Sequence, residues 1–215
     1  MRCGGGECDS SSGTGVSEPS AVSEPCAVRV LTAASRVAEP WRNGGGVTSE
    51  VAARPIGGGP AGFDWRLSIA TVAGDNPFSG YPGVDRMLMA ISPQGLDLVD
   101  GGVPVHLGQF DVHRFPGENE VAAVAVTSPT LDLNLNLMTR RGRCAGSLRS
   151  VHFSGLWTVE AGDGEDLALV VLDGSLRLGE RTLTALDAVL LEHAGRAQLE
   201  GTARVALARV ARIRH

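Results

Sequence analysis

One stretch of the chain decides the fold class: Leu131-Asp132-Leu133-Asn134-Leu135-Asn136-Leu137-Met138-Thr139-Arg140. Leucine occupies every second position up to Leu137, and the positions between carry polar side chains or Met138. Successive side chains of a β-strand point to opposite faces, so this period of two predicts a strand. One face is apolar and the other is mainly polar, and we expect the polar face to line either a polar interior or solvent.

The same period recurs along the chain and predicts an all-β fold. Trp65, Leu67 and Ile69 alternate with Arg66 and Ser68, which predicts a strand with two different faces. The alanines of residues 203–212 also suit a helix, but the pattern before them favours a closing strand. Many short strands at near-regular spacing are typical of a sandwich or barrel. Further strands are expected at 28–31, 167–172, 175–178, 182–183 and 188–192, with turns at 173–174, 179–180 and near residue 195.

Composition excludes several classes of function. The chain has 215 residues, a hydrophobic share of 43% and 29 glycines, which suits one or two turn-rich globular domains. It contains no lysine, and this excludes Schiff-base, pyridoxal-phosphate and P-loop chemistry. A net charge of -5 argues against nucleic acid as the partner. Neither a membrane-spanning apolar run nor a secretory signal is recognisable, so we expect a cytoplasmic protein without membrane contact.

The chain divides into three parts by composition. Residues 1–27 are rich in Gly, Ser, Glu and Pro, and we expect a disordered tail because such a segment buries too little apolar surface to offset its entropy. The pattern shifts again near residues 146–150. We therefore divide the remainder into a first β unit over 28–146 and a second, smaller one over 147–215.

Metal and nucleophile motifs are weak in this sequence. The four cysteines form no CxxC pair, and the five histidines do not form the HxH-plus-Glu pattern that holds a metal in many cupins. No GxSxG elbow is present for a serine nucleophile. We expect no metal, no cofactor and no assigned catalytic residue.

Four blocks resemble those of the HutD/Ves family of bacterial cupin-like proteins, in order and in approximate spacing. The resemblance implies an all-β double-stranded β-helix of two cupin-like barrels, a bicupin, with a small-molecule-binding role linked to histidine utilisation. One position departs from the family pattern: Asn134 stands where the family has an acid, which keeps a hydrogen-bond acceptor and removes a charge. The blocks are WRNGGGVTSE at 41–50, FDWRLSIA at 63–70, PFSGYPGVDRML at 77–88 and NLMTRRG at 136–142.

These blocks supply the candidate ligand-binding residues. Guanidinium groups bind carboxylates through paired hydrogen bonds and keep their charge when buried, so Arg66 and Arg86 are expected to bind an acidic ligand inside the first barrel. Two alternatives stay open: the arginines can pair with Glu50 or Asp85, and Gly44–Gly46 can be a turn rather than a ligand contact. The candidates are Trp41, Arg42, Asn43, Thr48, Glu50, Arg66, Ser68, Phe78, Arg86, Asn136, Met138 and Arg140.

We therefore expect a non-enzymatic protein that binds a carboxylate metabolite and is regulatory in histidine utilisation or amino-acid catabolism. The resemblance points to a formylglutamate- or urocanate-like ligand. We expect a monomer or a homodimer. Two alternatives remain: a metal-independent enzyme acting on a histidine-degradation intermediate, with Glu50 as the base, and a structural or interaction module with a vestigial cavity.

Overall fold

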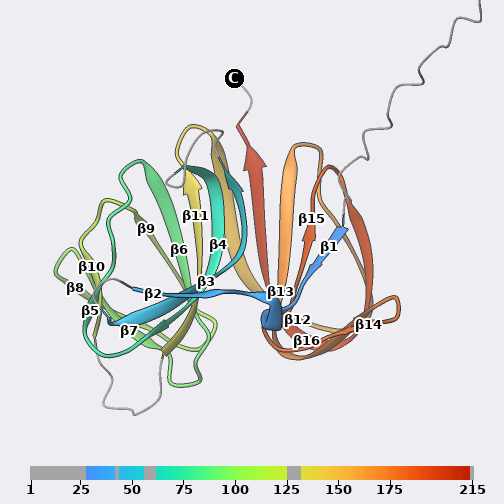
Figure 1. Ribbon diagram of the computed structural model, residues 1–215, viewed down its shortest axis with the longest axis horizontal. Helices are drawn as coiled ribbons and strands as arrows, with labels where there is room; N and C mark the ends of the chain where they lie inside the picture. The colour runs from blue at the N-terminus through green and yellow to red at the C-terminus, as the bar shows by residue number, and fades with distance from the viewer. Residues whose placement is uncertain (1–27, 42–43, 56–61, 125–131, 214–215) are drawn as a thin grey trace, which may run out of the picture.

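The computed structural model describes residues 28–41, 44–55, 62–124 and 132–213, and Figure 1 shows two β-barrels side by side. Within these residues the chain forms β-strands and one short 3-10 helix, η1 (Ala33–Ser35). The predicted all-β class is confirmed. No helix in this part of the chain is long and apolar enough to cross a membrane. The expected tail at 1–27 lies outside the described residues.

Three sheets build the two barrels. The central sheet has the strand order β2 (Ala38–Pro40), β3 (Gly46–Pro55), β4 (Phe63–Val72), β11 (Asp132–Arg140), β6 (Val84–Ala90) and β9 (Val112–Pro116). The small sheet has the order β5 (Asn76–Pro77), β10 (Val121–Val124), β7 (Leu96–Asp100) and β8 (Val103–Leu107). The C-terminal sheet has the order β1 (Val28–Leu31), β15 (Ala188–Leu191), β13 (Glu165–Leu178), β16 (Arg196–Arg212) and β12 (Cys144–Glu160), with β14 (Arg181–Leu183) paired to β13.

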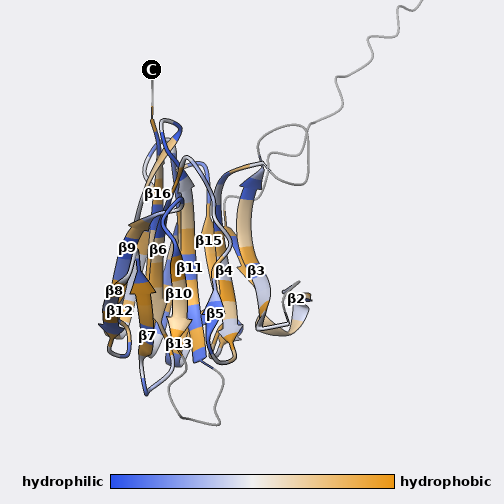
Figure 2. Ribbon diagram, turned by 90° about the vertical axis from the view of Figure 1, so that its left-hand side faces the viewer, coloured by the Kyte–Doolittle hydropathy of each residue, from blue (hydrophilic) through white to orange (hydrophobic). Residues whose placement is uncertain are grey.

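The two faces of the central sheet have different environments. One face, with Leu67 and Leu135, packs on Val170 and Leu190 of the C-terminal sheet and forms the core between the barrels. The other face turns into the first barrel, where Leu88 packs on apolar residues of the small sheet. Figure 2, seen from the first-barrel side, shows hydrophilic and hydrophobic residues alternating along these strands. The alternation predicted for β4 and β11 is therefore confirmed.

The second barrel is filled by apolar side chains. Its inner cluster includes Leu169, Val189, Leu199 and Leu207, all of which are buried. A polar interior is therefore expected in the first barrel and not in the second.

Two details of the C-terminal half differ from the predictions. The prediction of a turn at 173–174 is wrong, because β13 continues to Leu178 through a register shift between Val171 and Asp173. Gly174 permits this path, since its φ is 80° and a Cβ there would lie 2.3 Å from the Thr202 carbonyl oxygen. The closing strand expected at 203–212 is confirmed, and it begins earlier, at Arg196.

The first described strand joins the second barrel rather than the first. Residues 28–31, which the sequence division assigned to the first unit, pair antiparallel with β15. Val28 and Val30 pack on the apolar core of the second barrel, which explains this placement. The division expected at residue 146 falls within β12.

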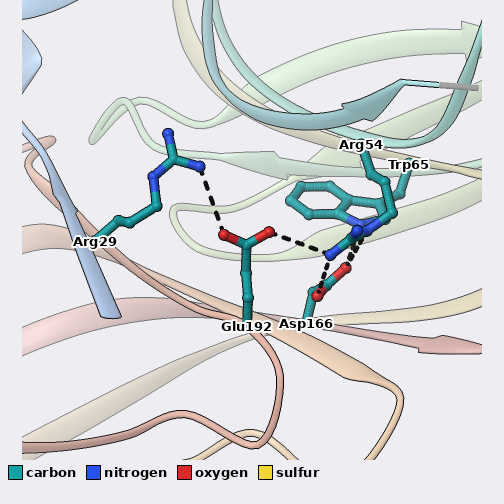
Figure 3. A network of polar contacts seen from close by, with 5 residues as sticks. All are labelled: Arg29, Arg54, Trp65, Asp166 and Glu192. Carbon is teal, nitrogen blue, oxygen red and sulfur yellow. Dashed lines mark hydrogen bonds and ion pairs between the residues drawn. The ribbon is translucent and has the colours of Figure 1, made fainter. Parts of the chain in front are cut away.

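A polar network joins the barrels through the buried carboxylate of Asp166 (Figure 3). Arg54 donates to both oxygens of Asp166 at 2.9 and 2.8 Å, and the Trp65 indole donates to Oδ2 at 2.8 Å. Arg54 also contacts Glu192 at 3.2 Å, and Glu192 lies 3.5 Å from Arg29. Three charge-assisted bonds compensate the burial of the Asp166 carboxylate.

Candidate functional site

The floor of the first barrel is an ordered grid of side chains on β4, β11 and β6. In the β11 pairings, Met138 lies between Arg66 and Arg86. Asn136 lies between Ser68 and Leu88 in the next row. Directly paired residues point to the same face of a sheet, so these rows project together into the barrel.

A pocket of about 550 Å³ opens over this grid. Aromatic side chains from the segments that follow β2 and β5 form its walls, whereas arginine, serine and asparagine side chains line its floor. The lining residues are Glu39, Pro40, Trp41, Thr48, Arg66, Ser68, Ala70, Pro77, Phe78, Ser79, Tyr81, Arg86, Leu88, Asn134, Asn136 and Met138.

Arg86 is a buried cation for which the described residues provide no carboxylate partner. It is 5% exposed, and its Nη1 donates to the Ser79 carbonyl oxygen at 3.1 Å. Its guanidinium carbon lies 5.5 Å from the ring centre of Phe78, 5.6 Å from that of Tyr81 and 4.9 Å from that of Phe115. Burial lowers the pKa of Arg86 to about 10. The aromatic rings stabilise the cation in part, and an anion in the pocket would complete its environment.

Arg66 differs from Arg86 because a carboxylate already accompanies it. Its Nε lies 3.1 Å from Oε2 of Glu50 on the neighbouring strand, at an angle that makes an ion pair rather than a hydrogen bond. The Glu50 side chain is 52% exposed, so the pair is well solvated on one side. The expected pairing of an arginine with Glu50 is thus present for Arg66, while Asp85 pairs with Arg141.

Two buried carboxamides in the pocket have unused hydrogen-bonding atoms. Asn134 is 1% exposed and Asn136 is 6% exposed. Among the described residues, Asn134 Nδ2 and Asn136 Oδ1 have no hydrogen-bond partner. An unpaired buried polar group costs about 1–3 kcal/mol, so this part of the pocket favours a ligand that accepts one hydrogen bond and donates another.

The three glycines at 44–46 shape the backbone around the Trp41 wall. Gly44 has a φ of 72°, which agrees with the expected turn. A Cβ on Gly46 would lie 2.6 Å from the Thr71 carbonyl oxygen and 3.0 Å from the Trp41 ring. The Trp41 indole donates to the Thr48 hydroxyl at 2.6 Å and meets Phe78 edge-to-face at 6.0 Å. Gly46 thus leaves room for the Trp41 ring, which its contacts with Thr48 and Phe78 hold in place as a wall of the pocket.

The match to known families agrees with this architecture. The HutD family model matches residues 33–208. The chain belongs to the HutD family. Protein Ves of Cronobacter sakazakii is 34% identical over 145 residues, which are 67% of this chain and 76% of that protein. An uncharacterised 21.2 kDa protein in the hutC 3' region of Pseudomonas putida is 37% identical over 105 residues, 48% of this chain and 55% of that protein.

Solved structures show the same fold. HutD from Pseudomonas fluorescens SBW25, described for a formate condition, has 25% identity and a TM-score of 0.74, covering 87% of this chain and 100% of that one. A cupin 2 conserved barrel domain protein from Leptotrichia buccalis has 10% identity and a TM-score of 0.52, covering 78% and 89%. The second likeness concerns the fold alone. The expected family and the two-barrel cupin fold are confirmed.

Most of the candidate residues meet in the pocket of this HutD-family chain. Trp41, Thr48, Arg66, Ser68, Phe78, Arg86, Asn136 and Met138 line it. Glu50 lies outside the lining and contacts it through Arg66. Arg140 also lies outside, because its Nε donates to the Phe63 carbonyl oxygen at 3.1 Å and its guanidinium sits over the Phe63 ring. Arg42 and Asn43 lie outside the described residues.

The candidate list omitted several lining residues. Ala70, Leu88 and Asn134 continue the period of two on their strands, so extending the pattern by one or two positions would have found them. Glu39 and Pro40 precede the first recognised block, and nothing in their sequence marks them. Ser79 contributes its carbonyl oxygen to Arg86, which no side-chain pattern can reveal.

The described lining contains few of the side chains that usually serve in acid–base chemistry. Its described members include neither histidine nor cysteine, and their one carboxylate is the exposed Glu39. The described residues also contain no group of three or more potential metal-binding side chains. What the pocket offers is positive charge, a hydrogen-bond donor and acceptor, and aromatic walls.

Proposed function

We propose that this HutD-family chain binds a small carboxylate metabolite in the first-barrel pocket, as a binding or regulatory protein in histidine utilisation. Arg86 carries the proposal: it is a buried guanidinium without a carboxylate among the described residues, and it lines a pocket of about 550 Å³. A ligand carboxylate would neutralise it through charge-assisted hydrogen bonds. The resident Glu50 pairs with Arg66 and does not serve Arg86.

The two asparagines indicate which chemical group the ligand carries at the end away from its carboxylate. Asn136 lies one row from the arginine row, a separation of about 7 Å along a strand. A neutral group that both donates and accepts, such as an amide or an imidazole, would satisfy Asn134 Nδ2 and Asn136 Oδ1 together. A formylglutamate- or urocanate-like molecule combines such a group with a carboxylate.

The names of two relatives agree with this proposal. The Pseudomonas putida protein is named after the hutC 3' region, and the Pseudomonas fluorescens structure bears the name HutD and a formate condition. An enzymatic role has less support, because the described lining residues supply no paired acid and base.

Isothermal titration calorimetry tests the proposal with matched ligands. Formylglutamate, urocanate, histidine and glutamate are compared, and urocanamide serves as the control because a neutral carboxamide replaces the carboxylate of urocanate. We expect an intermediate between histidine and glutamate to bind tightest, and urocanate to bind at least about tenfold tighter than its amide. Equal affinity of acid and amide, or no binding in the whole panel, would overturn the proposal.

A further inference from the structure

The outer strand β12 is an unusual sheet edge. It is 17 residues long, and β16 pairs with it in continuous register from Cys144 to Glu160. β12 ends the strand order of the C-terminal sheet, so within the described chain no strand pairs with its other side. The unpaired side presents a row of backbone donors and acceptors that can accept another strand.

The other sheet edges in the described residues are protected. These edge strands are each two to five residues long: β1, β2, β5, β8, β9 and β14. β2 ends in Pro40, β8 contains Pro104, and β9 carries Arg114 and Pro116. Short length, proline and outward charge are the usual devices that prevent edge-to-edge association. β12 has no proline and no break in its register with β16.

The exposed part of β12 is also nearly free of charge. Between Arg149 and Glu160 the sequence is SVHFSGLWTV, in which His152 is the one titratable side chain. Leu156 is 65% exposed, and Phe153 and Trp157 form a ring pair 5.2 Å apart at the margin of the core. A partner for this edge must therefore be uncharged, apolar and extended, and of similar length.

We propose that a second copy of this chain pairs antiparallel with β12, centred on Gly155. β12 itself has the required length and neutrality, and a two-fold axis presents the same strand twice. Residues 1–27 are poor candidates, because they are rich in Gly, Ser, Glu and Pro, which disfavour strands, and they lead into β1 at the far end of the sheet.

The centre at Gly155 gives complementary neighbours. Residues equally spaced from Gly155 lie opposite one another, so Phe153 faces Trp157 of the second copy, and Ser154 faces Leu156 of the second copy. The two aromatic pairs extend the ring contact already present in each chain. A Cβ built on Gly155 would meet no atom within 4 Å, so the axis position is open. No two like charges lie opposite one another in this register.

Light scattering after size-exclusion chromatography tests the dimer. Wild-type protein at about 50 µM should have a mass of about 45 kDa, twice the 22.3 kDa of the chain. Leu156→Lys places two like charges diagonally across the axis, and it should raise the dissociation constant at least about tenfold. Val103→Lys is the matched control, because Val103 is 62% exposed on a different edge strand, and its dimer should persist.

A second variant and a second measurement keep the test independent of one substitution. Ser154→Lys, also at an exposed position, should weaken the dimer like Leu156→Lys while circular dichroism shows an unchanged fold. Amide exchange in residues 150–159 should slow as the protein concentration rises. A wild-type monomer at about 50 µM, a dimer that survives both lysine variants, or equal loss with Val103→Lys would each overturn the proposal.

Discussion

Replacing Arg86 with methionine should separate ligand binding from stability. The variant removes a buried charge and keeps an unbranched side chain that can fill the space among Phe78, Tyr81 and Phe115. A structural arginine and a ligand-binding arginine respond to this change in different ways. Removing a structural arginine would lower the free energy of unfolding strongly. Removing a ligand-binding arginine would instead weaken the affinity for the ligand.

The structure gives the size of the stability effect. Burial lowers the pKa of Arg86 to about 10, and this shift from its ordinary value corresponds to a cost on the order of 3 kcal/mol for keeping the guanidinium charged. Against this stand three ring contacts of about 0.5–1 kcal/mol each and one hydrogen bond of about 1 kcal/mol. The two sides nearly cancel. The free energy of unfolding without ligand should therefore change by less than about 1.5 kcal/mol in Arg86→Met.

Affinity should respond far more strongly. Loss of a charge-assisted contact of about 1.5–3 kcal/mol weakens binding roughly ten- to a hundredfold. Urea unfolding measures the stability, and calorimetry with the tightest carboxylate of the panel measures the affinity. Arg66→Met is the comparison, because the charge of Arg66 is already accompanied by Glu50, and its loss should weaken binding less. A loss of more than about 3 kcal/mol of stability in Arg86→Met with unchanged affinity would show that Arg86 is structural.

Three further predictions concern groups with defined environments. The pKa of Arg86 in the folded protein, about 10, lies below its value in the unfolded chain, so above pH 10 the unfolded chain keeps this proton while the folded protein loses it. The free energy of unfolding of the wild type, measured relative to Arg86→Met, should therefore rise between pH 9 and 11. If this difference in free energy did not change with pH, the burial of the charge would be contradicted. Asp166→Asn removes the carboxylate that Arg54 and Trp65 share and should destabilise by about 3–5 kcal/mol in urea, whereas Glu160→Gln, in an exposed pair with Arg196, should change stability by less than about 1 kcal/mol. Burial raises the pKa of the Cys144 thiol and should slow its reaction with a disulfide reagent. In a variant with Cys3, Cys8 and Cys26 replaced by serine, the reaction at pH 8 should be at least about tenfold slower with native than with unfolded protein. Equal rates would show that the Cys144 thiol is accessible.

Much of the candidate site was predictable from local pattern. The period of two placed Arg66 and Ser68 on one face of β4, and Asn136 and Met138 on one face of β11, and the structure puts these four in one pocket. Arg140 shows where the pattern fails. It continues the polar face of β11, but at the end of the strand its guanidinium turns to the Phe63 ring outside the pocket lining.

The sequence by itself determined the all-β class, the two faces of the main strands and the family, because strand periodicity and ordered motifs are local properties of the chain. Only the tertiary structure decided which charges have partners. Glu50 meets Arg66 across neighbouring strands, Asp166 meets Arg54 from 112 positions away, and Arg86 meets aromatic rings instead of a carboxylate. The placement of β1 against β15 is of the same kind. Coulomb energies and burial depend on distances in space, and those distances are set when strands far apart in the chain pair and pack.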